Sequence, residues 1–164
     1  MRHEDSFHAI HVEYPSTKPF DAVVAAFEAA TGDIEDGAFA RELDASSTPD
    51  DFENRMKARE GDSGFMRFLM LDHGAWLTFN GQQAKCRLYT LGNPLIARTM
   101  LRHDIGAGLN VPVRLIIFET AAGEVRVGYD LPSSLMSRLA NSDVMEAASK
   151  LDAKLQALAE HIVQ

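Results

Sequence analysis

The start of the chain alternates apolar and polar side chains. Ile10, Val12 and Tyr14 are separated by single polar residues, and this two-residue period is typical of a strand with one buried face. The pattern predicts a strand over residues 7–14. Apolar side chains then recur at helical spacing after Pro19, which predicts an amphipathic helix that follows the strand directly.

Residues 33–63 have a different character, because they are rich in acidic side chains and poor in large apolar ones. We interpret this segment as a surface insert. Thr48 can cap a helix, and a proline suits the first helical position after it. A short helix to about residue 60 is therefore expected, with Phe52 and Met56 as its only apolar anchors.

The second half of the chain contains four more predicted strands. The 65–71 and 87–91 segments are dense in apolar residues, and 111–119 and 124–130 are separated by a four-residue loop that contains Gly123. A glycine suits the left-handed position of a short hairpin loop, so the last two strands should pair antiparallel.

Two more helices are expected in the same half. A short helix should start beside Leu95, after the Gly92-Asn93-Pro94 turn. The longest periodic signal is a C-terminal helix capped by Asn141 or Ser142. Its apolar stripe runs in steps of three and four residues and consists of Val144, Ala148, Leu151, Leu155, Leu158 and Ile162.

This order of elements predicts one α+β domain over residues 1–164, because a hairpin near the end replaces strict alternation of strands and helices. An antiparallel or mixed sheet with helices on one face is expected. The length and the 46% hydrophobic content are sufficient for one ordinary core.

Composition restricts the setting and the partners. Cys86 is the only cysteine, so neither an internal disulfide nor a thiolate zinc site can form within one chain. With no secretory signal and no apolar run long enough to span a membrane, the cytoplasm is the predicted location and no membrane partner is expected. The net charge of −8 argues against nucleic acid as a partner, because a phosphate backbone would be repelled.

Four short motifs carry a family resemblance. They are Asp72-His73, residues 91–95 (LGNPL), residues 108–114 (GLNVPVR) and residues 129–132 (YDLP). In this order and spacing the chain resembles the bacterial and archaeal family called domain of unknown function 302. The resemblance implies a fold like the TATA-binding-protein class, a β-α-β-β-β-β-α arrangement whose antiparallel sheet curves around the C-terminal helix. It implies no activity, and residues 33–63 depart from the family pattern.

Arg114 and His73 are the charged and titratable candidates for a site. Arg114 lies in the middle of an apolar strand, where a guanidinium needs a partner. It could bind an anion, or it could form a salt bridge with Asp72 or Asp130. His73 follows a predicted strand end, where it could act as a general base or make only a turn hydrogen bond.

Asn93 and Tyr129 are the remaining candidates. Asn93 could orient a substrate carbonyl or cap the following helix. Tyr129 could donate to a ligand, although Val125, Val127 and Tyr129 also form one apolar strand face, as a core tyrosine would. Cys86 is expected to be a partly buried, inert thiol. We hypothesise that His73, Asn93, Arg114 and Tyr129 converge on one pocket.

Three functions remain open from the sequence. The first is a binding domain for a small organic anion, with Arg114 supplying the charge. The second is an enzyme that acts on such a metabolite with His73 as its base, and the third is a structural subunit. No metal or cofactor motif is present, so neither group is expected. A homodimer is predicted, because the edge strands of an open sheet need cover.

Overall fold

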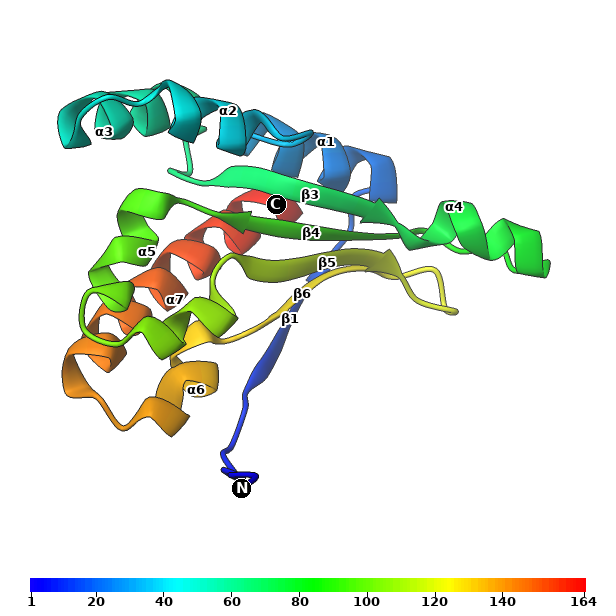
Figure 1. Cartoon of the computed structure of the whole chain (residues 1–164). Coiled ribbons are helices and arrows are strands. Elements are labelled where there is room, and N and C mark those ends of the chain that lie inside the picture. The colour runs from blue at the N-terminus through cyan, green and yellow to red at the C-terminus, as the bar shows by residue number, and fades with distance from the viewer.

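The computed structural model describes residues 1–164 and has a six-stranded mixed sheet at its centre (Figure 1). The strands lie in the order β1-β6-β5-β4-β3-β2. Their bounds are β1 His11–Ser16, β2 Gly32–Asp33, β3 Met66–Asp72, β4 Cys86–Gly92, β5 Val113–Glu119 and β6 Val125–Asp130.

Helices connect these strands and extend beyond both ends of the sheet (Figure 1). The larger helices are α1 Phe20–Ala30, α2 Ala38–Ala45, α3 Pro49–Arg59, α5 Pro94–Leu101 and α7 Ser142–Val163. The shorter ones are α4 His73–Leu77, α6 Pro132–Met136 and the 3-10 turns η1 Thr78–Asn80, η2 Ile105–Asn110 and η3 Ser137–Leu139. The α+β class is confirmed.

The sheet is antiparallel except at one edge. The β5 and β6 strands form the expected hairpin, and β1 joins its far side, with His11 opposite Asp130. Only β2 runs parallel to its neighbour β3, so the sheet is mixed. The first strand begins at His11 rather than at residue 7.

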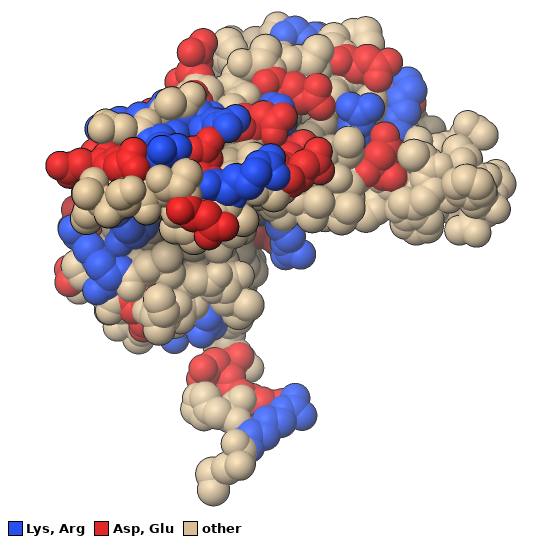
Figure 2. Space-filling view, turned by 45° about the horizontal axis from the view of Figure 1, so that its top comes forward, with Lys and Arg blue, Asp and Glu red and all other residues tan.

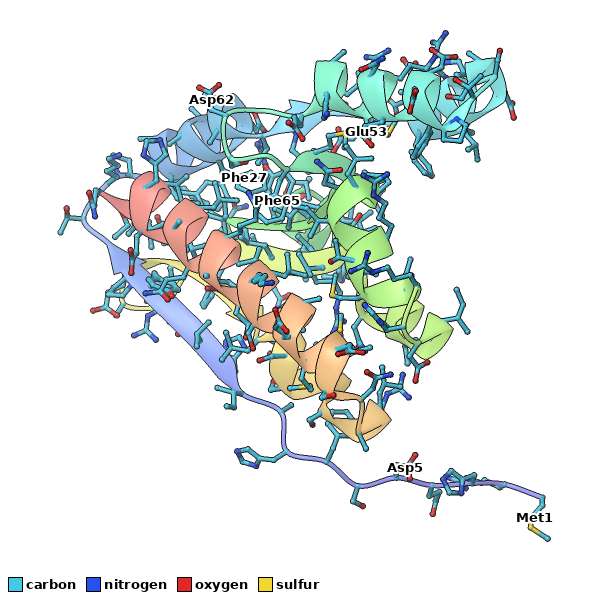
Figure 3. All side chains as sticks on the ribbon, turned by 90° about the vertical axis from the view of Figure 1, so that its left-hand side faces the viewer. Met1, Asp5, Phe27, Glu53, Asp62 and Phe65 are labelled. Carbon is cyan, nitrogen blue, oxygen red and sulfur yellow. The ribbon has the colours of Figure 1, made fainter.

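One face of the sheet is covered by α1 and α7, and the core lies between them. Phe27 and Phe65 are both fully buried there and point into the space between the helices and the strands (Figure 3). The predicted stripe of α7 is confirmed, since all six of its residues are buried. Asn141 caps this helix, and its side-chain oxygen accepts from the backbone N–H groups of Asp143 and Val144.

The opposite face of the sheet, which we call the open face, has no helix layer over its centre. Alternation along the strands places one row of side chains on it, formed by Leu71, Leu88 and Ile116 with Gly128 at its end. A second row pairs Cys86 with Phe118. The open face is therefore apolar over β3, β4 and β5.

Residues 33–63 form α2 and α3 beside the β3 edge of the sheet (Figure 1). Thr48 caps α3 as predicted, and its hydroxyl accepts from the Asp51 N–H at 3.1 Å. The prediction that only Phe52 and Met56 anchor this segment is wrong. Ile34 and Ala38 are also buried, and they form a small second cluster with Met56 and the strand residue Met66.

Residues 73–84 form a projection that the sequence pattern does not predict, and we call it the arm. It consists of α4, η1 and the residues that lead back to β4, and it extends past the end of the sheet (Figure 1). Asp72 caps α4, and its carboxylate accepts from the Ala75 N–H.

No helix of the protein, α7 included, has the length and hydropathy to cross a bilayer.

Candidate functional site

An apolar cavity of about 490 Å³ lies at the end of the sheet where β4 leads into α5 and β5 begins. Ten of its sixteen lining residues are hydrophobic. They come mainly from α5 and the ends of β4 and β5, with single residues from α2, β3 and α7. Phe39 of α2 packs edge-to-face on Phe68 of β3, with ring centroids 5.4 Å apart. The cavity is thus shared between the main domain and the segment of residues 33–63.

The turn between β4 and α5 shapes this cavity. Gly92 has no side chain between Pro112 and Phe68, and a Cβ built there would lie 3.6 Å from Pro112 and 3.7 Å from Phe68. Asn93 ends the strand and caps α5, and Pro94 takes the first helical position. The Gly-Asn-Pro sequence therefore ends the strand, starts the helix and leaves space beside both.

Two arginines of α5 and its C-cap lie on the cavity wall, and they differ in their partners. Arg98 donates to the Glu53 carboxylate at 2.9 Å, so its charge is compensated. Arg102 pairs with no carboxylate, and its Nε donates to His103 Nε2 at 3.0 Å. Arg102 therefore supplies the uncompensated positive charge at this cavity.

Arg114 lies elsewhere, on the open face, and its side chain is 68% exposed. Arg114 is therefore not buried within its apolar strand, and its guanidinium reaches solvent. Its nearest carboxylate is that of Asp130, at 3.9 Å, which agrees with one of the two salt bridges considered. The hollow beside it has a volume of about 180 Å³ and is also lined by His11 and Leu88.

His11 was not among the candidate residues, yet it lies at the centre of a polar cluster on this face. Its Nδ1 lies 2.8 Å from an Asp130 oxygen, and its Nε2 lies 3.3 Å from Glu13. The hydrogen bond with Asp130 is the main cause that raises the pKa of His11, while partial burial acts in the opposite direction. Because His11 and Asp130 are far apart in sequence, only the register of β1 on β6 brings them together.

His73 is the first residue of α4, at the base of the arm. Its Nδ1 accepts from the indole N–H of Trp76 at 3.1 Å. Asp72, just before it, lies opposite Arg87 in the register of β3 on β4. Arg114 lies opposite Thr90 in the register of β4 on β5. Those two rows are three residues, or roughly 10 Å, apart along β4, so His73 does not share the hollow beside Arg114.

Asn93 and Tyr129 have the structural roles that were the alternatives for them. The Asn93 carbonyl oxygen accepts from the Leu95 N–H, and its amide donates to Glu60 at 2.6 Å and to the Gly64 carbonyl at 3.0 Å. Tyr129 is 3% exposed on the core face, and its ring stacks on Tyr14. Burial and the nearby Tyr14 hydroxyl raise the pKa of Tyr129.

The four candidate residues therefore do not converge on one pocket. Arg114 and Tyr129 both line the hollow on the open face, although the Tyr129 side chain is buried on the core side. Asn93 lines the cavity at α5, and His73 lies at the far end of the sheet. Burial, followed by the charge of Asp72, raises the pKa of Cys86, as expected for an inert thiol. No three His, Cys, Asp or Glu side chains come together as metal ligands. The sequence analysis missed the cavity at α5, although its Leu91-Gly92-Asn93-Pro94-Leu95 motif lies on the cavity wall.

Comparison with known families settles the identity of the domain. The family model for the domain of unknown function DUF302 matches residues 39–162. The chain belongs to the DUF302 family. The cavity at α5, the open face of the sheet and the whole arm all lie within or beside the matched residues.

A solved structure extends the DUF302 likeness to nearly the whole chain. It is the crystal structure of an uncharacterized conserved DUF302 protein from Bacillus stearothermophilus, with a TM-score of 0.67 and 14% sequence identity. The alignment covers 94% of this chain and 98% of that one. At this identity the likeness supports the fold alone. A search of the curated proteins found no match.

Proposed function

We propose that this DUF302 protein binds a small amphipathic anion, with the apolar part of the ligand in the cavity at α5 and its negative charge at Arg102. The observation that carries the proposal is the combination of a largely apolar wall with one uncompensated arginine. An anion remains the proposed ligand, as in the sequence analysis, but the site moves from Arg114 to α5.

Volume favours the cavity at α5 over the hollow beside Arg114. Ligand pockets in proteins occupy about 300–1,000 Å³ and are lined mainly by apolar side chains with a few polar groups. The α5 cavity, at about 490 Å³, falls within this range. The hollow beside Arg114, at about 180 Å³, falls below it.

The arrangement of charges favours a ligand with one negative group. Arg98 is held by Glu53 and is not available to a ligand without losing that pair. Arg102 has only a neighbouring imidazole as partner, and a guanidinium can hold a carboxylate or a sulfonate through two parallel hydrogen bonds. A ligand without an anionic group would leave this capacity unused.

Fluorescence of 8-anilinonaphthalene-1-sulfonate, which combines an aromatic body with one sulfonate, tests the proposal. Saturable binding to the wild-type protein is expected, with displacement by medium-chain carboxylates and weaker displacement by the matched alcohols. Gly92→Leu should abolish binding, because the extra side chain would extend between Pro112 and Phe68 into the cavity. Gly92 does not have a positive φ, so leucine is compatible with its backbone.

Two arginine variants separate the two sites. Arg102→Gln should weaken binding about tenfold or more, since a hydrogen bond to a charged group contributes about 1.5–3 kcal/mol. The matched variant Arg114→Gln removes another exposed guanidinium, on the open face, and should leave the affinity unchanged. If Arg114→Gln weakens binding while Arg102→Gln and Gly92→Leu do not, the site at α5 is wrong.

A further inference from the structure

The open face leaves large apolar side chains in contact with solvent. Leu69 and Leu71 of β3 are 45% and 42% exposed. They pair with Thr90 and Leu88 of β4, and the Leu88 row continues into Ile116 of β5. A sheet face that meets only water normally carries polar side chains, so this composition needs a partner to explain it.

The arm, which extends past the end of the sheet, carries further exposed apolar side chains. Trp76 is 51% exposed and Phe79 is 91% exposed. Residues 73–84 contain no Lys, Arg, Asp or Glu, whereas the 24% charged content of the chain would place about three there. Figure 2 shows the arm without any of the charged surface that covers the neighbouring helices.

The open face carries charged residues of both signs. Arg114 and Arg126 provide two positive charges, and ion-paired Glu13, Glu124 and Asp130 provide three negative ones. The molecule as a whole carries a net charge of −8, so two copies repel one another over most of their surfaces. On the open face most of the negative charge is paired with arginine, so this repulsion is weaker there and each copy presents both signs to the other.

The available area is appropriate for a stable association. Leu69, Leu71, Trp76 and Phe79 together expose on the order of 450 Å² of apolar surface, given the areas of large side chains. This is more than half of the ~800 Å² that each partner buries in a standard interface. Partly exposed neighbours such as Ile116 and Phe118 and the polar residues at the rim add to it.

We propose that the open face and the arm form the interface of a two-fold symmetric homodimer. In such a dimer the same patch of each copy meets itself, so the arginines of one copy can face the carboxylates of the other. The sequence analysis expected a dimer because of the sheet edges, whereas the structure points to a sheet face. The interface is independent of the proposed ligand site, because the cavity at α5 lies at the other end of β4 from the arm.

Sedimentation velocity and the concentration dependence of the melting temperature test this interface. The wild-type protein should sediment at twice 18.1 kDa at micromolar concentration, and its melting temperature should rise with concentration. The double variant Leu71→Asp and Phe79→Asp should be monomeric under the same conditions. Both side chains are exposed, and an unchanged far-ultraviolet circular dichroism spectrum will show that the variant folds.

The matched control is Ile105→Asp, which places the same charge on an 81% exposed isoleucine in η2. This variant should remain dimeric. A wild-type protein that stays monomeric at 100 µM would overturn the proposal, as would a double variant that remains dimeric. If the monomeric wild type co-sediments with phosphatidylcholine vesicles and the double variant does not, the surface serves a membrane and not a second copy.

Discussion

His11 shows how one side chain on the open face depends on its neighbours. Asp130 and Glu13 hold its two ring nitrogens, and the hydrogen bond with Asp130 raises the pKa of His11 above the ordinary value of 6.5. A proton on this imidazole is bound more tightly in the folded protein than in the unfolded chain. Protonation of His11 therefore stabilises the folded state.

The pH dependence that follows has a defined sign. The contribution of His11 to the free energy of unfolding should be fully present below about pH 6.5 and be lost as the pH rises through the folded-state pKa. Titration of the His11 ring protons by NMR and urea unfolding at several pH values will measure both quantities. Asp130→Asn should lower the pKa of His11, and a wild-type value at or below 6.5 would contradict this explanation.

Arg114 shows why the candidate site could be predicted only in part. Residues 111–119 form an almost continuous apolar run, which is typical of a strand buried on both faces. In the structure Val113, Leu115 and Ile117 face the core, while Arg114 and its open-face neighbours do not. The sequence identified the motifs around the α5 cavity, but the apolar open face made Arg114 resemble an interior residue.

At the scale of elements, periodic segments could be predicted and aperiodic ones could not. The strand β6 has a two-residue period and the helix α7 has a helical one, and both elements occur where expected. The arm has no such period in its sequence, and its large side chains Trp76 and Phe79 are exposed. The two-residue strand β2 is too short to produce a pattern. The likeness to the TATA-binding-protein class stays a prediction.

The segment of residues 33–63 is held more firmly than its composition indicates. Met56 is fully buried against Ile34 and Met66, and Glu60 accepts a hydrogen bond from the buried amide of Asn93. Three buried apolar residues of this segment therefore pack with Met66 of β3 in the second cluster. The segment also supplies Phe39 to the cavity at α5.

Met56→Ala tests how much this second cluster contributes. The substitution should lower the free energy of unfolding by about 2–5 kcal/mol, as is usual when a buried methionine is truncated. The control is Leu43→Ala in α2, where the leucine is 52% exposed and the change should stay within about 0.5 kcal/mol. Urea unfolding will measure both. Equal effects of the two variants would show that the segment is only a surface insert.

For the whole molecule, one surface accounts for several unusual features of the sequence. The apolar residues of β3, the charge-free arm and the misleading composition of β5 all belong to the open face and its extension. The helix-covered face carries the core, whereas the open face is apolar without a helix over its centre. Only the three-dimensional arrangement distinguishes the two faces, because a buried apolar strand face and an exposed one have the same sequence pattern.

The position of β1 has a consequence for how the protein is made. Its only partner in the sheet is β6, with His11 opposite Asp130. The strand β1 therefore cannot pair until β6, the last strand of the sheet in chain order, has been synthesised. Such distant pairing slows folding and leaves a strand exposed meanwhile. Ribosome-bound chains that end before Val125 should be digested rapidly by protease around residues 11–16. Longer chains, in which β6 and α7 have emerged from the ribosome, should resist digestion at the same residues. Resistance in the shorter chains would show that β1 finds another partner during synthesis.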